Sequence, residues 1–296
     1  MLAAAALVLL ILGFFAGLGL LYYAWIEART LRLRRFTLRF ADLPAAFDGY
    51  RIVFASDFHV RRQRLIHRKL LAALGTLEGD LLILGGDFQN RRNERHDRAI
   101  AFIDALALLA PRYPDGVLAV RGNHDGAAVR AYLKQHATIR YLAPGAHVIR
   151  RGGEAIAVAG VRKSPHESAA RMERQVALAR AAIPGDVPFR ILMAHWPEYF
   201  FPAAAAGFQL ILSGDTHGGQ IRLPLVGALI KKTELPQRYA WGLVQEKGAT
   251  LYTTNGVGTQ SFPFRLLCPP EVLVFELRRE TANALAGTTE TMRIGR

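Results

Sequence analysis

The sequence predicts an α/β fold, because short apolar runs ending in polar clusters recur along the chain and helical patterns separate the first of them. The runs are residues 50–56, 80–86, 117–122, 189–194 and 208–214. Each is apolar on both alternations and is closed by Gly or another small residue, which is typical of a buried central strand. Helical patterns at 65–77 and 95–109 alternate with these strands, so we expect a partly parallel sheet.

Each predicted strand is followed by residues that commonly ligate metals. A single Asp or Asn after a strand is usually a turn former or a helix cap. Here all the strand ends carry such residues, and ligand groups in these sheets gather beyond the carboxyl ends of the strands. Two neighbouring carboxylates would also repel each other without a cation between them. We therefore predict a two-metal site formed by Asp57, His59, Asp87, Asn123, His195 and His217.

The N-terminal segment is predicted to be an uncleaved membrane anchor. No side chain from Leu2 to Ile26 is charged, and roughly 25 residues at about 1.5 Å each exceed a hydrocarbon core of about 30 Å. A signal peptide would carry basic residues before the apolar run, whereas here Arg29 and further arginines follow it. By the positive-inside rule, we expect a single-pass protein of the inner (cytoplasmic) membrane with its catalytic domain in the cytoplasm.

The formal net charge of +14 suits an anionic partner. Arginines cluster at 29–39, 61–68 and 91–98, which allows an acidic membrane leaflet, a phosphorylated substrate or a nucleic acid. Nucleic acid is the least favoured of these, since no platform of interleaved aromatic and basic residues is visible. The single cysteine, Cys268, excludes an internal disulfide. The sequence gives no indication of oligomeric state.

We divide the chain into four parts. Residues 1–27 are the transmembrane anchor, and 28–48 are a basic juxtamembrane segment leading into the domain. Residues 49–280 form one catalytic domain, because no linker or repeat interrupts them, and 281–296 are expected to be a disordered tail.

The polar blocks resemble those of the calcineurin-like metallophosphoesterases. The matching blocks, in order, are DFH (57–59), GGDF (85–88), GNHD (122–125), AHWP (194–197) and GDTHGGQ (214–220). The segments 214–224 and 255–271 look most like a membrane-anchored bacterial branch that includes enzymes related to cleavage of UDP-2,3-diacylglucosamine in lipid A synthesis. The resemblance implies a four-layer αββα sandwich with two mixed β-sheets.

The resemblance also implies a role for each site residue. Asp57, His59 and His217 would hold the first metal, and Asp87 would bridge the two. Asn123, His195 and Asp215 would complete the second metal, and His124 would act on the substrate phosphate as a general acid or charge stabiliser. Two divalent ions about 3.5–4 Å apart can share a hydroxide that attacks phosphorus in line.

Two positions depart from the family pattern. Asp215 stands where most members have histidine, so the two cations face three carboxylates and the site is closer to neutral. This change favours hard, oxygen-preferring ions, and we expect Mn²⁺, with Fe or Zn as alternatives. Asn90 stands where many members have an aspartate that orients the histidine of the GNH block, so His124 should be less easily kept protonated.

The resulting functional hypothesis is a membrane-anchored phosphoesterase or pyrophosphatase acting on a lipid-linked phosphate. UDP-2,3-diacylglucosamine is a candidate substrate, and Arg61, Arg91 and Arg265, which follow the predicted strand ends, are candidate ligands of a diphosphate. The alternatives are a nuclease or general phosphodiesterase, and a metal-binding scaffold with weakened catalysis.

Overall fold

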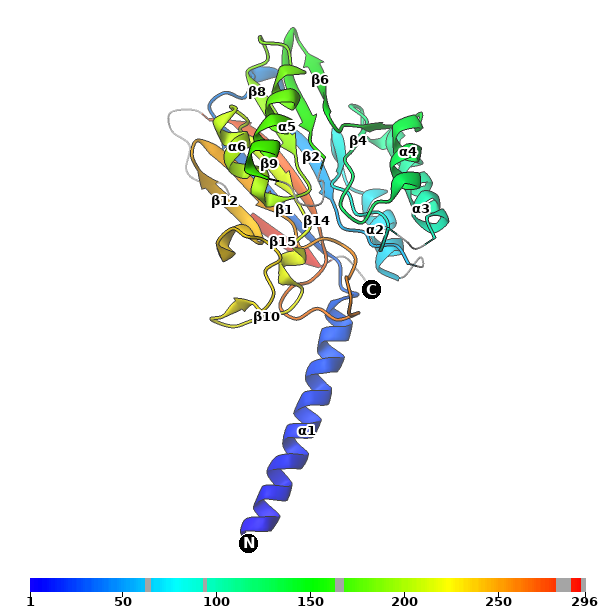
Figure 1. Ribbon diagram of the computed structural model, residues 1–296, viewed down its shortest axis with the longest axis vertical. Helices are drawn as coiled ribbons and strands as arrows, with labels where there is room; N and C mark the ends of the chain where they lie inside the picture. The colour runs from blue at the N-terminus through cyan, green and yellow to red at the C-terminus, as the bar shows by residue number, and fades with distance from the viewer. Residues whose placement is uncertain (62–64, 93–94, 163–167, 281–288, 294–296) are drawn as a thin grey trace.

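The computed structural model describes residues 1–61, 65–92, 95–162, 168–280 and 289–293. Figure 1 shows a body of sheets and helices from which one long helix, α1 (Leu2–Glu27), projects, so that the N-terminus lies far from the body. The remaining helices of more than one turn are α2 (Leu65–Leu74), α3 (Asp97–Ala107), α4 (Ala127–Gln135), α5 (Ala169–Ala181) and α6 (Phe200–Ala205).

The first large sheet has the strand order β15-β1-β14-β2-β3-β4-β5. Its strands are β1 (Arg32–Phe40), β2 (Tyr50–Ala55), β3 (Leu81–Leu84), β4 (Val117–Ala119), β5 (Ile139–Tyr141), β14 (Glu271–Arg279) and β15 (Thr289–Arg293). The steps from β2 to β5 are parallel, whereas β14 is antiparallel to β2 and parallel to β1. The sheet is therefore mixed.

The second large sheet has the order β12-β13-β9-β8-β7-β6. Its strands are β6 (Gly145–Arg151), β7 (Glu154–Gly160), β8 (Phe189–Met193), β9 (Leu210–Ser213), β12 (Gly242–Glu246) and β13 (Ala249–Thr253). It is also mixed, with parallel steps from β7 to β13 through β8 and β9 and antiparallel strands at both edges. A small hairpin, β10 (Arg222–Leu223) and β11 (Gly227–Ala228), lies outside both sheets.

Three apolar clusters show how these layers are stacked. One lies between the two sheets, where Phe54 and Phe275 of the first meet Ile191 of the second. Another packs α2 and α3 on the outer face of the first sheet, and the third packs α5 and α6 on the outer face of the second. Since each sheet buries both faces, its central strands are apolar on both alternations. The predicted four-layer αββα arrangement is confirmed.

The predicted strands and helices are found within one to three residues of their expected limits, as boundary assignments usually vary. The juxtamembrane segment differs from expectation, because Arg32–Phe40 is strand β1 inside the first sheet. Its alternating burial puts Leu33, Phe36 and Leu38 in the core. Of the predicted disordered tail, 289–293 form β15 against β1, and the rest lies outside the described residues.

The helix α1 makes contact with the body only near its C-terminal end. Its apolar stretch, Ala4–Glu27, has a mean hydropathy of 2.6 and is long and apolar enough to cross a membrane. At its C-terminal end, Ala24 and Glu27 are buried and Ile26 is half-buried. The backbone N–H of Arg265 donates to the carbonyl of Ala24 (3.0 Å), and that of Cys268 donates to Glu27 Oε2 (3.2 Å). The loop at 262–268 thus fixes the base of α1 to the body.

Candidate metal centre

The predicted ligands lie in the loops that follow β2, β3, β4, β8 and β9, at adjoining ends of the two sheets. Five of them have a left-handed backbone, with φ of 57° at Asp57, 46° at His59, 55° at Asp87, 65° at Asp215 and 52° at His217. Residues other than glycine seldom adopt this conformation, and where it clusters it commonly marks a functional site.

Backbone hydrogen bonds hold these strained loops together. The N–H of Asp57 donates to the carbonyl of Gly86, and the N–H of His59 donates to the carbonyl of Asp87, both at 2.9 Å. The N–H of Asp215 donates to Asp57 Oδ1 at 2.9 Å, which joins the first sheet's loop to the second's. The side chains are consequently aimed at one point by the backbone and not by their own rotamers alone.

Two groups of side chains can each hold a metal ion. Asp57, His59 and His217 offer ligand atoms that all lie within 4.8 Å of one another, and so do Asp57, Asp87 and His195. Asp57 belongs to both groups in this geometry. Asp87 also lies between them, because its Oδ2 is 3.5 Å from His59 Nε2 and 3.3 Å from His195 Nε2. The structure thus brings five of the predicted ligands together: Asp57, His59, Asp87, His195 and His217.

Several buried acceptor atoms at this point have no hydrogen-bond partner among the described residues. They include Asp57 Oδ2, Asn123 Oδ1 and His195 Nε2. His59 faces the same point with Nε2, which lies 3.5 Å from Asp87 Oδ2. Buried polar atoms are almost always paired, since leaving one unpaired costs about 1–3 kcal/mol. Oxygen and imidazole nitrogen atoms without a proton donor are the atoms that a divalent cation would ligate, so the residues present fit a two-metal centre.

The ring of His195 is oriented for metal binding by the backbone. Its Nδ1 donates to the carbonyl of Gly85 at 2.7 Å, which leaves Nε2 as the atom that faces the site. Nε2 lies 3.6 Å from Asp215 Oδ1 and 3.8 Å from Asp57 Oδ1. When one ring nitrogen of a histidine donates to a carbonyl in this way, the other nitrogen is left to ligate the metal, and both the tautomer and the direction of the ring are fixed.

Asp215 is held by a residue that the sequence analysis did not single out. The indole Nε1–H of Trp196 donates to Asp215 Oδ2 at 2.6 Å, while Oδ1 remains on the side of His195. Trp196 directly follows His195 in the chain, so one segment supplies both a ligand and the group that positions another ligand. The only sequence signal was its place in the AHWP block.

Glycines next to the carboxylates leave no room for a side chain. A Cβ on Gly122 would overlap the Asp87 carboxylate, and one on Gly214 would overlap that of Asp57. A Cβ on Gly256, whose φ is +71°, would lie 2.6 Å from the Cβ of Asp57. In the loops after β4, β9 and β13, the backbone therefore contacts the ligands at a glycine, where a side chain would not fit. This explains the glycine in the GNH and GD blocks.

His124 is positioned by the backbone of Asn90. The ring Nδ1 lies 2.5 Å from the Asn90 carbonyl, which is an acceptor, so Nδ1 carries the proton. As predicted, Asn90 orients His124. It does so through its backbone carbonyl and not through its side chain, and an aspartate at this position would offer the same carbonyl. Nε2 is 2.5 Å from Gln260 Nε2, a neighbour that the sequence did not reveal. His124 also donates its backbone N–H to Asp87 Oδ1 at 2.8 Å.

Asp125 supports the loops and does not act on His124. Its carboxylate accepts the backbone N–H groups of Asp87 (2.9 Å), Gln89 (3.0 Å) and Gly122 (2.9 Å). These donors belong to the loops after β3 and β4, so this one buried side chain sets the spacing between the two loops. No local pattern predicts this role for Asp125, which follows His124 in the GNHD block.

Burial and mutual charge set the protonation of the ligands. Burial lowers the pKa of His59 to about 3 and that of His217 well below its ordinary value, so both imidazoles are neutral and free to ligate. Burial, with the nearby Asp87 and Asp215 carboxylates, raises the pKa of Asp57 to about 6. Burial opposes a charge on His195, but the surrounding carboxylates outweigh it and raise its pKa.

The predicted substrate arginines occupy three different environments. Arg265 is fully buried, and its guanidinium donates to the carbonyls of Asn255 (2.8 Å) and Cys268 (3.0 Å) and lies 3.3 Å from His217 Nδ1. Its interior position differs from the expected place on the rim, because the loop that carries it folds under His217. Arg61 lines the groove described next, whereas Arg91 is exposed and does not line it.

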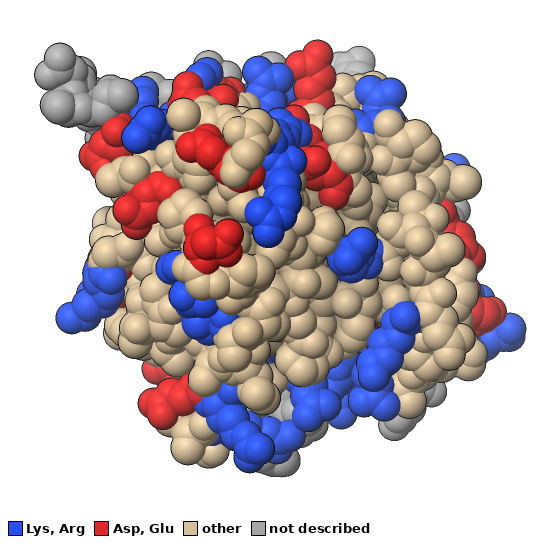
Figure 2. Space-filling model, turned by 90° about the horizontal axis from the view of Figure 1, so that it is seen from above, with Lys and Arg blue, Asp and Glu red and all other residues tan. Residues whose placement is uncertain are grey.

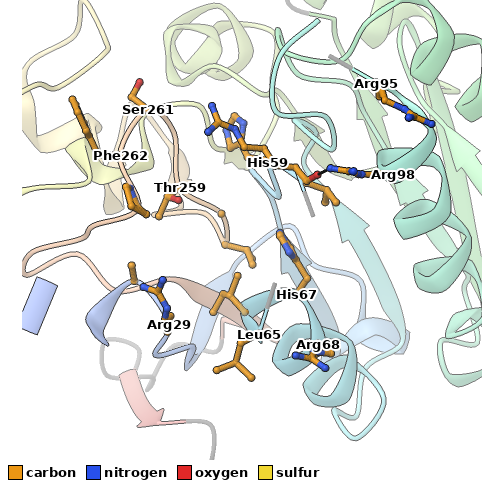
Figure 3. Close-up of a pocket in the computed structure, with 17 residues that line it drawn as sticks. Arg29, His59, Leu65, His67, Arg68, Arg95, Arg98, Thr259, Ser261 and Phe262 are labelled. Carbon is orange, nitrogen blue, oxygen red and sulfur yellow. Dashed lines mark hydrogen bonds between the residues drawn. The ribbon is translucent and has the colours of Figure 1, made fainter. Parts of the chain in front are cut away.

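A groove of about 1040 Å³ opens beside the metal centre. Figure 3 shows His59 in its wall, Phe262 and Ser261 on the loop at one side, and Leu65 and Arg68 on α2. The groove extends to Ala28 and Arg29, directly after α1. Among the described residues, five arginines line it, at positions 29, 61, 68, 95 and 98, together with apolar side chains from α2 and the 257–263 loop. Such a lining suits an anionic ligand with an apolar part.

Comparisons with known proteins found a matching family and several similar proteins. Residues 50–219 match the family described as Calcineurin-like phosphoesterase. The chain is 30% identical to the uncharacterized metallophosphoesterase YkuE of Bacillus subtilis, over 89% of this chain and 91% of that protein. It is 32% identical to the phosphodiesterase YaeI of Escherichia coli, over 88% and 93%. A solved structure of GAP50 from Plasmodium aligns with a TM-score of 0.47 and 11% identity, covering 83% of this chain and 89% of that one.

Proposed function

The chain belongs to the calcineurin-like phosphoesterase family and is a metal-dependent phosphoester hydrolase. From that premise we propose that it is anchored in the inner membrane by α1 and cleaves a phosphodiester or pyrophosphate bond in a lipid-linked substrate. The observation that carries this proposal is the groove, which has a metal ligand, His59, in its wall and the residues that follow the anchor at its other end.

The anchor and the groove favour a substrate presented at a membrane surface. Arg29 lines the groove and is two residues beyond α1, so a ligand in the groove lies close to the plane where α1 would leave the bilayer. Tyr22 and Trp25 near this end are the residue types that favour the membrane–water boundary. Arginines near the surface would also attract anionic lipids, by about 1 kcal/mol each.

The residues at the centre would hold two divalent cations. Asp57, His59 and His217 fit one, and His195 and Asp87 fit the other. Asp215, 3.6 Å from His195 Nε2, and Asn123, whose buried Oδ1 has no hydrogen-bond partner, would complete the second. Bound there, the cations would neutralise phosphoryl charge and activate water. We favour Mn²⁺ because three carboxylates and an amide oxygen supply hard ligands, with Fe or Zn as alternatives. His124, with its Nε2 on the side of Gln260, is the group placed to interact with the phosphate.

The bond cleaved is proposed to be a diester or a pyrophosphate. The name of the relative YaeI, a phosphodiesterase, supports the diester. UDP-2,3-diacylglucosamine combines a pyrophosphate with acyl chains, and the groove's arginines and apolar side chains would suit both parts. We therefore keep it as the first substrate to test, beside other lipid-linked and nucleotide diphosphates.

The decisive experiment measures turnover of bis-p-nitrophenyl phosphate by purified full-length protein in detergent with added Mn²⁺. Asp87→Ala should lower turnover by about a hundredfold or more, since it removes charge from both metal sites. Asp186→Ala, at an exposed position away from the centre, is the matched control and should leave turnover unchanged. Absence of metal-dependent turnover on any phosphodiester or diphosphate would favour a scaffold.

A screen for UMP or phosphate release then identifies the substrate class. The same preparations are presented with lipid-linked and soluble nucleotide diphosphates. Faster release from the lipid-linked compounds, lost in Asp87→Ala, supports the proposal. Equal or faster release from soluble substrates, or salt-sensitive cleavage of single-stranded DNA, would contradict it.

A further inference from the structure

A patch of exposed apolar side chains lies beside the base of α1. It comprises the hairpin loop 223–230, which carries β11 and part of β10, and the loop 262–267; together we call them the membrane-side loops. Leu225 at the hairpin tip is completely exposed, and Ile230 and Phe262 are each 65% exposed. The other exposed apolar residues of these loops are Leu223, Val226, Leu229 and Leu267. Exposed apolar residues gathered in this way indicate an interaction surface.

The two loops are joined to each other and to α1 by backbone contacts. Ile221 pairs with Leu266 in a short parallel bridge, and the N–H of Arg222 donates to the Leu266 carbonyl at 2.9 Å. The next residue towards the N-terminus, Arg265, is bonded to Ala24 of α1. Figure 1 accordingly shows β10 at the end of the body from which α1 projects. The patch and the anchor therefore share one side of the molecule.

Charge distinguishes this side from the opposite one. The sequence contains no Asp or Glu from 218 to 232 or from 256 to 270, and the exposed Lys231 directly follows the hairpin loop. The face seen from the side away from α1 carries acidic residues among basic ones (Figure 2). Apolar side chains bordered by a lysine, in loops without acidic residues, match the interfacial region of a bilayer with anionic lipids.

We propose that the membrane-side loops insert into the interfacial region of the bilayer that α1 spans. This inference rests on the proposed membrane anchoring, and it adds a second contact that fixes the orientation of the body. Tyr22 and Trp25, which favour the membrane–water boundary, lie on α1 at the same height as Ala24, to which the loop 262–267 is hydrogen-bonded. A single helix leaves the body free to rotate and tilt, whereas a second contact at that level removes this freedom.

The insertion would connect the bilayer directly with the metal centre. Phe262 is both an exposed side chain of the membrane-side loops and a residue that lines the groove (Figure 3). Ser261 and Pro263 line the groove beside it. An amphiphilic substrate could thus enter the groove from the membrane with its apolar part remaining against lipid.

The test uses full-length protein in vesicles of phosphatidylethanolamine and phosphatidylglycerol, labelled with bimane at a single introduced cysteine. Cys268 is fully buried and should not react. We expect brominated lipids to quench bimane at Leu225→Cys and at Val226→Cys. Leu178→Cys on α5, an exposed leucine on the opposite side, is the matched control and should remain unquenched.

A label at Leu12→Cys in α1 separates the two proposals. Quenching at Leu12 but not at Leu225 or Val226 would overturn the insertion and leave the anchor intact. A Leu225 label that is shielded from water but not quenched would identify another protein surface as the partner, and would also overturn the inference. Absence of quenching at Leu12 would overturn the anchoring and the insertion with it.

Discussion

Asp215 is one of two positions expected to depart from the family pattern, and its surroundings suit a carboxylate. Trp196 donates to one oxygen, and the other lies 3.6 Å from His195 Nε2. An imidazole at this position would accept only through an unprotonated nitrogen, so Trp196 and the metal would compete for it. The tryptophan and the aspartate therefore form one unit.

We predict that Asp215→His shifts metal preference from Mn²⁺ towards Zn²⁺ or Co²⁺, on the order of tenfold in the ratio of activities. The reason is the loss of a hard oxygen ligand together with its negative charge. The measurement is turnover of bis-p-nitrophenyl phosphate after reconstitution with each metal. Asp186→His, at an exposed site, controls for the added imidazole; an unchanged metal profile in Asp215→His would contradict the prediction.

Metal binding should depend on pH through His195 and Asp57. The carboxylates around His195 overcome the effect of burial and raise its pKa, so a proton must leave when the metal binds. Apparent affinity should then rise by about tenfold per pH unit below that pKa. Below about 6, the raised pKa of Asp57 adds a second proton and a steeper slope. Calorimetric titration of Mn²⁺ from about pH 5 to about pH 8 checks this; a flat dependence would contradict it.

At the scale of elements, the strand ends and the glycines that follow them act together. Each strand delivers its ligand, and a neighbouring loop approaches closely as bare backbone. Gly122 after β4 contacts the carboxylate of Asp87 after β3, and Asp125 holds both loops at this spacing. The position of the Asp87 carboxylate therefore depends on Asp125, which is not itself a predicted metal ligand.

We predict that Gly122→Ala lowers metal affinity by about 10–100-fold, the range for residues that orient ligands. The new Cβ would overlap the Asp87 carboxylate, which must then move. Gly185→Ala is the matched control, because its Cβ would meet nothing within 4 Å. Calorimetric metal titration gives the affinity and circular dichroism confirms folding. Normal affinity in folded Gly122→Ala would show that the loop can relax.

Some strands are evident from the sequence, whereas others are recognised only from their pairing in the sheet. The buried strands β2, β3, β8 and β9 are almost entirely apolar, with Arg51 and Arg190 as their charged residues, and the sequence predicts them directly. The strand β1 resembles a juxtamembrane segment in sequence because arginines alternate with its apolar residues. Arg34 of β1 bonds to Tyr252 and Glu271 across the sheets, so part of the basic cluster is structural. Only the pairing of β1 with β14 distinguishes these roles.

At the scale of the whole molecule, the arginines after α1 would set the orientation of the proposed membrane anchor. We predict that Leu178→Cys is not labelled by a membrane-impermeant maleimide in intact spheroplasts but is labelled after lysis. The reason is that the basic residues after α1 keep the body in the cytoplasm. Adding lysines before Leu2 should weaken this bias and increase labelling. Labelling of Leu178→Cys in intact cells would contradict a cytoplasmic body.

The sequence alone determined the α/β class, the apolar helix and the identity of the residues that converge at the metal centre. It could do so because strand ends and ligand types are local properties of the chain. Only the tertiary structure decided which group orients each ligand: the main chain of Asn90 for His124, Trp196 for Asp215, and the interior for Arg265. These contacts join loops from different strands, and no local pattern records the distance between them.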